Sequence, residues 1–279
     1  MLKICILIRV YDRLDDLKYC LQLINDTWLT NDYYILVVCN GVSKGYIVNQ
    51  ELEKEIDYLL VLEENAGHLK GNAQLLTEGL KFIPYDTAYT IILEADTWIY
   101  TDSIINKYIK QLEETKAVWA SAQWYTTYFS LATDFAILDH NFLKLHPLVF
   151  NYTGYPECYA ANYINDNDLK YVYIKENMPV HLPNYLKKYV YAPAGRFNVF
   201  VRSKMVTHHT EQYKNGISTK KAHLNRVAGK AYFTDIETEN YNLQKSLMSF
   251  LIALVNFLPR KSWFLKTQQF NTKITHANI

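Results

Sequence analysis

The sequence lacks an excess of charge of either sign. Lys and Arg together number 29 and Asp and Glu together number 28 among 279 residues, which gives a formal net charge of +1. A protein that binds nucleic acids or acidic surfaces through overall charge needs a strong positive electrostatic field of its own. A chain with balanced charge does not have one. We therefore expect no nucleic-acid partner, and any anion site must be local.

The sequence also lacks closely spaced cysteines. Its four cysteines, Cys5, Cys20, Cys39 and Cys158, are far apart and form no Cys-x-x-Cys pair, which argues against a structural zinc site. Apolar neighbours around most of them are typical of buried free thiols in a reducing compartment.

The N-terminal apolar run ends at Arg9 and is therefore too short for the hydrophobic region of a signal peptide. We expect a cytoplasmic protein.

No hydrophobic run is long enough to cross a membrane. The most apolar segment, 247–258 (LMSFLIALVNFL), is shorter than the roughly 20 residues that a spanning helix needs. Three interpretations stay open for it: a helix docked on the rest of the protein, a contact in a homodimer, or a peripheral helix at the inner face of the membrane. The flanking Lys245, Arg260, Lys261 and Trp263 are compatible with the last one.

Short apolar runs alternate with helical patterns through the first hundred residues. The runs cover 4–8, 34–38, 58–62 and 89–93, and helical spacing covers 14–24 and 72–82. This alternation predicts an α/β fold with a Rossmann-like, mostly parallel sheet covered on both faces. Functional side chains of such sheets collect just beyond the carboxyl ends of the strands.

The second half of the chain has a different pattern. Residues 117–131 are rich in aromatic residues and threonine, and 171–174 predict another strand, which indicates mixed pairing in this part of the sheet. Residues 203–239 are polar with little periodicity, so we expect an irregular or mobile segment there.

These patterns predict two regions. The first covers 1–205 and divides into 1–100, where short apolar runs alternate with helical patterns, and 101–205, where the pattern changes. The second is a C-terminal extension over 206–279 that holds the mobile segment and an apolar helix.

An acidic triplet, Glu94-Ala95-Asp96, follows the fourth apolar run. Residues two apart on an extended segment point the same way, so Glu94 and Asp96 can bind one ion while Ala95 lets a nucleotide approach closely. Mg²⁺ or Mn²⁺ held by carboxylates neutralises a diphosphate leaving group. A solvated turn at a strand end is the alternative, and the buried strand before the triplet favours the metal site.

The string Asn-Ala-Gly-His-Leu-Lys-Gly-Asn at 65–72 is similar to the Asn-x-Gly-x-x-Lys-Gly-Asn stretch of family 2 glycosyltransferases, which have the GT-A fold. Over roughly residues 3–182 the chain most closely resembles the rhamnosyltransferase-like branch, whose Asn-Pro-Asp-Thr motif corresponds to 94–97. Arg9 stands where that family has proline, and Cys39 where it has an acid that binds the base. Because only the second acid of the triplet is shared with that branch, Asp96 is the firmer metal ligand.

The resemblance implies that 1–205 is a GT-A catalytic domain, with a donor-binding half (1–100) and an acceptor half (101–205). It also implies a set of donor-binding residues from the first four strand ends. They are Tyr11, Arg13, Asn40, Asn65, Gly67, Lys70, Gly71, Asn72, Glu94 and Ala95.

The resemblance also implies a general base and a histidine ligand. Inverting sugar transfer needs a base for the acceptor hydroxyl, and the family carries it in an acidic pair before a helix; Glu157 is the one acid of that pair present here. His181 lies where family members place a histidine on the metal or diphosphate, and imidazole suits Mn²⁺. His208-His209 is an alternative source of this ligand, which we rank below His181.

The sequence therefore predicts an inverting hexosyl- or deoxyhexosyltransferase of polysaccharide biosynthesis. It would move a sugar from a nucleotide-diphosphate sugar to a hydroxyl of a glycan or lipid-linked acceptor. A nucleotidyltransferase is one alternative, although residues 10–14 lack the glycine-rich basic loop that it would need. A degenerate, non-catalytic nucleotide-sugar-binding protein is the other.

Overall fold

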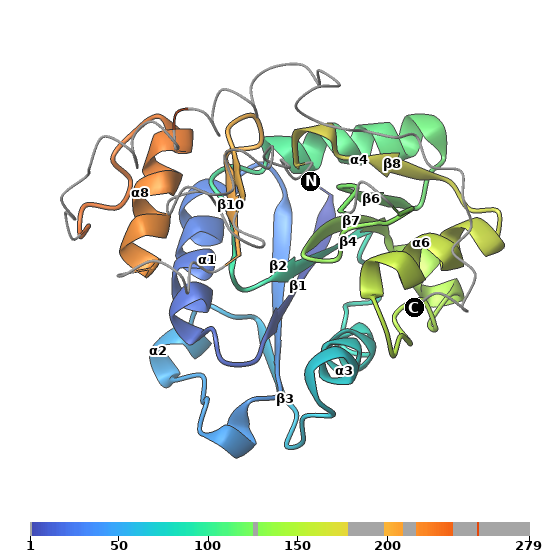
Figure 1. The fold of residues 1–279 in the computed structure, drawn as a ribbon, viewed down its shortest axis with the longest axis horizontal. Coiled ribbons are helices and arrows are strands. Elements are labelled where there is room, and N and C mark those ends of the chain that lie inside the picture. The colour runs from blue at the N-terminus through green and yellow to red at the C-terminus, as the bar shows by residue number, and fades with distance from the viewer. Residues whose placement is uncertain (1, 125–127, 178–197, 209–215, 237–249, 251–279) are drawn as a thin grey trace, which may run out of the picture.

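A seven-stranded sheet forms the centre of the protein (Figure 1). The computed structural model describes residues 2–124, 128–177, 198–208, 216–236 and 250. The sheet has the order β3-β2-β1-β4-β7-β6-β8, in which β7 runs opposite to both of its neighbours and the other pairs are parallel. The mixed, mostly parallel α/β sheet predicted from the sequence is therefore confirmed.

The strands of this sheet are β1 (Lys3–Val10), β2 (Asp32–Cys39), β3 (Tyr58–Val61), β4 (Tyr89–Glu94), β6 (Trp119–Ser121), β7 (Phe135–Asp139) and β8 (Tyr171–Tyr173). The helices are α1 (Leu14–Thr27), α2 (Gln50–Glu53), α3 (His68–Leu80), α4 (Ser103–Thr115), α5 (His140–Leu145), α6 (Pro156–Asp166) and α8 (Gly216–Ala228), with short 3₁₀ turns at η1 (Val42–Lys44) and η2 (Lys175–Asn177).

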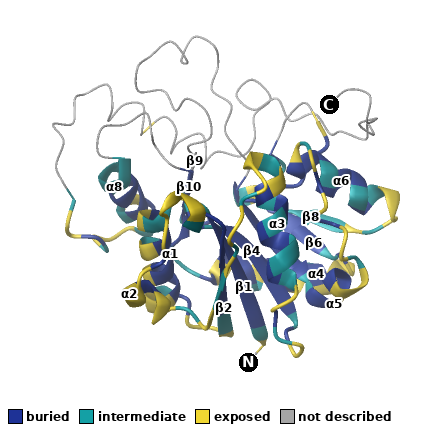
Figure 2. Cartoon of the chain, turned by 90° about the horizontal axis from the view of Figure 1, so that it is seen from below, coloured by how far each residue is buried: buried dark blue, intermediate teal, exposed yellow. Residues whose placement is uncertain are grey.

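Side chains of β1 alternate between two hydrophobic cores because successive residues of a strand face opposite sides of the sheet. Ile4, Ile6 and Ile8 pack in the core that includes α1, α4 and α8. Cys5 and Leu7 pack in the core that includes α3, α5 and α6. Figure 2 shows the sheet buried between these helices, whose outer faces are exposed.

A second, three-stranded antiparallel sheet lies beside the first. It has the order β5-β10-β9, formed by β5 (Thr97–Ile99), β10 (Met205–Thr207) and β9 (Asn198–Phe200). β5 follows directly after the acidic triplet, so this pairing brings a segment from late in the chain next to it. The second sheet is the element that completes the candidate site.

Two local predictions are wrong. The segment 203–239 contains β10 and the helix α8 rather than irregular chain alone. The inward face of α8 includes Lys220 and Lys221, and these polar residues hide the hydrophobic periodicity of the helix.

The second wrong prediction is the start of α3. This helix begins at His68, not at Asn72, because Gly67 adopts a φ of 97° and ends the preceding loop as the N-cap. A positive φ of this kind favours glycine.

All four cysteines are buried and free, as expected from their apolar neighbours. Among the described residues, no helix is long and apolar enough to cross a membrane. The apolar segment 247–258 lies outside the described residues except for Phe250, and His181 also lies outside them.

His140, the first residue of α5, gives the fold a pH dependence. Its ring is buried, Nδ1 lies 3.0 Å from the Thr90 hydroxyl, and burial, aided by Lys144, lowers its pKa to about 4. The unfolded chain binds this proton more readily than the folded protein. The contribution of His140 to the free energy of unfolding is therefore fully present above about pH 6.5 and is lost as the pH falls toward 4. We expect the wild type to lose about 2 kcal/mol through this group between pH 7 and 4.5.

The measurement is urea unfolding at both pH values, with His140→Asn compared with His68→Asn, whose side chain is exposed. His140→Asn should flatten the pH dependence and His68→Asn should leave it unchanged. Equal slopes in all three proteins would contradict this account.

Candidate active site

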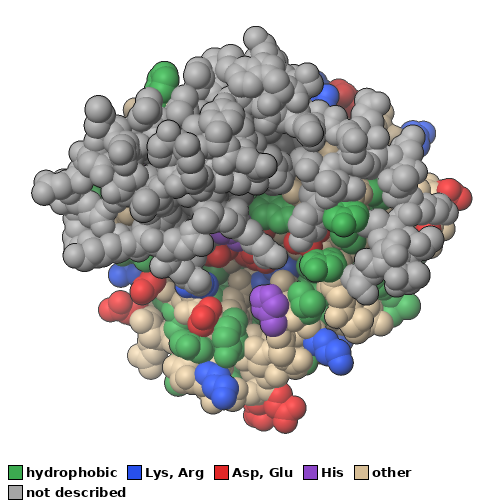
Figure 3. All heavy atoms as spheres, viewed as in Figure 1, with side chains coloured by type: hydrophobic (Ala, Val, Ile, Leu, Met, Phe, Trp, Pro, Cys, Tyr) green, Lys and Arg blue, Asp and Glu red, His purple; other side chains and the backbone are tan. Residues whose placement is uncertain are grey.

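A cleft of about 710 Å³ opens at the carboxyl ends of β1, β2 and β4. On the face drawn in Figure 3, acidic side chains and histidine gather in a hollow near the middle of the molecule. The cleft is lined by Arg9, Val10, Tyr11, Asp12, Arg13, Asn40, Ser43, Lys44, Asn65, Gly67, His68, Gly71, Asn72, Leu75, Glu94, Ala95 and Asp96. Of the residues predicted to bind the donor, only Lys70 is not in this lining, and its side chain is exposed.

The Asn-Gly pattern at 65–72 shapes one wall of the cleft. Asn65 Oδ1 accepts a hydrogen bond from the backbone N–H of Gly67 at 2.7 Å. A Cβ at Gly71 would lie 2.3 Å from that same Oδ1, so any larger residue would displace Asn65. Asn40 Nδ2 donates to the Gly71 carbonyl at 3.1 Å, which ties the end of β2 to the first turn of α3.

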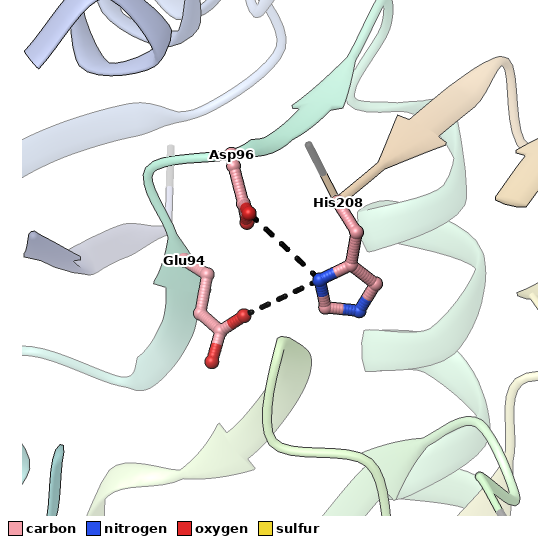
Figure 4. A group of neighbouring side chains, drawn as sticks. All are labelled: Glu94, Asp96 and His208. Atoms are coloured by element: carbon pink, nitrogen blue, oxygen red, sulfur yellow. Dashed lines mark ion pairs between the residues drawn. The ribbon is translucent and has the colours of Figure 1, made fainter. Parts of the chain in front are cut away.

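Glu94 and Asp96, which line the cleft, converge with His208 (Figure 4). Their potential ligand atoms lie within 4.8 Å of one another. His208 Nδ1 is 3.8 Å from Glu94 Oε2 and 3.8 Å from Asp96 Oδ2. This spacing leaves room for a cation at the centre of the cluster.

Strand pairing places His208 there. β10 pairs with β5 in the register Thr207↔Thr97, and the next backbone N–H, that of His208, donates to the Asp96 carbonyl at 3.1 Å. The hydroxyls of Thr97 and Thr207 lie 2.8 Å apart. His208 has a φ of 64°, in the left-handed region where histidine is enriched, and this turns its ring toward the acids.

The charges in the cluster are strongly coupled. Burial pushes the pKa of Asp96 upward, but His208, Lys220 and Arg13 outweigh it and hold that pKa below its usual range. Burial opposes protonation of His208, yet Asp96, Glu94 and Asp134 raise its pKa. These carboxylates therefore favour the protonated form of His208.

The donor set fits a divalent cation. Asp96 Oδ1 is buried and has no hydrogen-bond partner among the described residues, and His208 Nδ1 is the ring nitrogen that faces both Asp96 and Glu94. A carboxylate oxygen and a neutral imidazole are suitable ligands for Mn²⁺, and the cation would replace the proton on His208. Of the two histidine sources considered from the sequence, the structure describes His208 and places it in the cluster.

Asp134, which the sequence motifs did not indicate, lies beside this cluster. Its carbonyl accepts from the Glu94 N–H at 2.8 Å, and its Oδ2 lies 3.9 Å from His208 Nε2. Burial raises its pKa to about 6, although His208 opposes this. Asp134 immediately precedes β7, and because β7 is antiparallel, its start meets the carboxyl ends of the parallel strands. The antiparallel direction of β7 is the signal from which Asp134 could have been predicted.

Arg9 is the second functional residue that the sequence motifs did not predict. Its side chain is buried, and Nη2 lies 2.9 Å from Glu94 Oε1 while Nη1 donates to Asn72 Oδ1 at 2.7 Å. Nη2 also donates to the Thr133 carbonyl. Glu94 is therefore already engaged by a cation, whereas Asp96 Oδ1 is free to bind one.

Glu157 lies in the first turn of α6 and is buried. It does not line the cleft, but its charge contributes to raising the pKa of Asp134 and of Tyr152. Trp124 contacts the His208 ring edge-on, with ring centroids 5.1 Å apart.

Comparison with known proteins gives remote structural likenesses only. No family model and no curated protein matches the chain. The mannosyltransferase PcManGT from Pyrobaculum calidifontis, solved in complex with GDP-Man and Mn²⁺, has a TM-score of 0.48 at 11% identity over 88% of this chain and 68% of its own. S. aureus TarS has a TM-score of 0.46 at 9% identity, over 88% of this chain and 47% of its own.

A third similar structure belongs to a different named activity. The 4-diphosphocytidyl-2C-methyl-D-erythritol synthase from Anaerococcus prevotii has a TM-score of 0.43 at 12% identity, over 62% of this chain and 86% of its own. All three TM-scores are below 0.5, so the function has to be argued from the site of this chain.

Removing the Arg9 guanidinium should destabilise the protein. Arg9→Met leaves the carboxylate of Glu94, whose side chain is 26% exposed, without its buried cation. We expect a loss of about 2–4 kcal/mol in the free energy of unfolding, measured by urea titration. Arg13→Met, at a partly exposed side chain, should cost less than about 1 kcal/mol. Similar losses in both variants would refute a special role for the Arg9–Glu94 pair.

Proposed function

We propose that this protein is a metal-assisted, inverting glycosyltransferase of the GT-A type, related to the rhamnosyltransferase-like branch of family 2. Its activity would be transfer of a hexosyl or deoxyhexosyl group from a nucleotide-diphosphate sugar to a hydroxyl of a glycan or lipid-linked acceptor. The observation that carries the proposal is the cluster of Glu94, Asp96 and His208 at a cleft large enough for a nucleotide.

The donor would lie along the strand ends with its diphosphate toward Asp96. Tyr11, Arg13, Asn40 and the 65–72 loop would hold the nucleotide, and Arg13 and Lys44 supply positive charge in the cleft. Cys39 replaces the acid that reads the base in the resembling family, and its buried side chain packs in the core. Base recognition therefore falls to other residues of the cleft.

Asp96 and His208 are the proposed ligands of a divalent cation, Mn²⁺ or Mg²⁺. When bound, the cation would neutralise charge on the diphosphate leaving group. Glu94, held by Arg9, would complete the site as a third ligand, or reach the ribose or a cation-bound water. His181 stays a proposed ligand from the segment outside the described residues.

Glu157 is the proposed general base. Inversion requires that the acceptor hydroxyl attack the anomeric carbon from the side opposite the diphosphate while a base takes its proton. The buried carboxylate in the first turn of α6 belongs to the half of the chain proposed to bind the acceptor, and its charge acts on Asp134. The segment 206–279 would form the extension, in which 247–258 contacts a membrane or a second copy of the chain.

Metal binding tests the proposal first. Asp96→Asn and His208→Ala should each weaken Mn²⁺ binding at least about 10-fold by isothermal titration, because each removes a ligand. Asp86→Asn changes an exposed carboxylate paired with Lys3 and should bind Mn²⁺ like the wild type. A screen with UDP-, GDP- and dTDP-sugars in Mn²⁺ should then identify a donor that raises the melting temperature. Unchanged Mn²⁺ affinity in Asp96→Asn would exclude this metal site.

The base is tested separately. Glu157→Gln should lower kcat for transfer by roughly 10²–10⁴-fold while leaving donor and Mn²⁺ affinity near wild-type values. Glu114→Gln, an exposed change on α4, serves as the control. Release of pyrophosphate from a nucleoside triphosphate and a sugar phosphate would instead indicate a nucleotidyltransferase, and donor binding without turnover would indicate a non-catalytic binding protein. Full transfer activity in Glu157→Gln would exclude this residue as the base.

A further inference from the structure

A fully buried lysine connects the helix α8 to the turn that carries Asp96. Lys220 has no solvent exposure. Its Nζ lies 2.5 Å from Asp16 Oδ1 in α1 and donates to the backbone carbonyl of Asp96 at 2.5 Å. The same ammonium lies over the ring of Trp98, 4.3 Å from its centroid. One side chain thus joins α8, α1 and the segment that carries Asp96.

Stability alone is a weak explanation for this arrangement. Removing an ammonium and a carboxylate from water costs free energy, and apolar residues of similar volume often replace a buried ion pair without loss. The neighbouring Lys221 shows the less costly alternative, because it pairs with Asp235, whose side chain is 68% exposed. What distinguishes Lys220 is its second hydrogen bond, to the main chain of the proposed metal ligand.

The Asp96 carbonyl is the point where two long-range connections meet. It accepts one hydrogen bond from Lys220 Nζ and another from the backbone N–H of His208. Two donors on one carbonyl restrict rotation of the Asp96 peptide, and the direction of a side chain follows from the orientation of its own backbone. The carboxylate of Asp96 is therefore held toward Glu94 and His208, as Figure 4 shows.

We propose that Lys220 is a positioning residue that fixes Asp96 for metal binding, so that α8 is a required part of the site. This inference rests on the proposed function, because it assumes that Asp96 is a metal ligand. Lys220 does not touch the substrate or the cation in this account. It acts through the main chain of Asp96.

The test removes this contact without changing the local net charge. Lys220→Met alone would remove the cation paired with Asp16, and it would also remove a positive charge that opposes cation binding. The double variant Asp16→Asn/Lys220→Met removes one charge of each sign. Asp16→Asn alone would leave the buried ammonium without this counter-charge, so Lys221→Met, on the same helix, is the control for affinity.

Mn²⁺ affinity is measured by electron paramagnetic resonance on the full-length chain, and folding is checked by thermal unfolding. We expect the double variant to fold and to bind Mn²⁺ about 10-fold more weakly than the wild type, while Lys221→Met stays within about 3-fold of it. Amide hydrogen exchange of 95–98 in metal-free protein should also be faster in the double variant, because the Asp96 peptide loses an anchor.

The outcomes separate this inference from the proposed function. Wild-type Mn²⁺ affinity and unchanged exchange in the folded double variant would overturn the positioning role and leave the metal site intact. Equal weakening in Lys221→Met would also overturn it, since general destabilisation of α8 would then explain the effect. If the wild type bound no Mn²⁺, the proposed metal site would fail, and the role of Lys220 would fail with it.

Discussion

The hydrogen bond from the His208 N–H to the Asp96 carbonyl is the constraint on which the site depends. It continues the β5–β10 ladder by one residue beyond Thr97↔Thr207. Asp96 lies just beyond the carboxyl end of β4 in the main sheet, and the small second sheet places His208 beside Asp96. Neither sheet alone contains the cluster. The short antiparallel pairing between β5 and β10 is therefore what brings His208 together with Glu94 and Asp96.

The cluster is also a balance of charges in a largely buried region. Four carboxylates lie close to three cationic side chains; these are Asp16, Glu94, Asp96 and Asp134, and Arg9, His208 and Lys220. Burial would disfavour so many anions in one place, and each has a positive neighbour that stabilises its ionised form. A divalent cation at the centre would supply the positive charge that protonation of His208 supplies in its absence. The two other cations, each fixed by its own hydrogen bonds, would remain.

The parts of this structure that could be predicted from sequence are those set by neighbouring residues. The apolar runs that became β1, β2 and β4 locate the strand ends, and thus the cleft. α3 was placed four residues late because the positive φ of Gly67 does not appear in hydrophobic periodicity. His208 and Lys220 were missed or undervalued because their partners are distant, with Lys220 and Asp96 separated by 124 positions. Lys220 and Lys221 are buried but count as polar residues in a hydrophobicity pattern, so the pattern does not show which face of α8 is packed.

Arg9 shows how one substitution redistributes roles within the site. It pairs with Val38 of β2 on one side and with Glu94 of β4 on the other, at the point where the strand order reverses. Proline, which the resembling family has here, carries no N–H and would remove a hydrogen bond from a central strand. Arginine keeps the ladder and extends β1 to Val10, and its guanidinium then binds Glu94. Because Glu94 is held in this way, Asp96 and His208 are the proposed principal ligands of a cation, and metal binding would then depend on how accurately the Asp96 backbone is fixed.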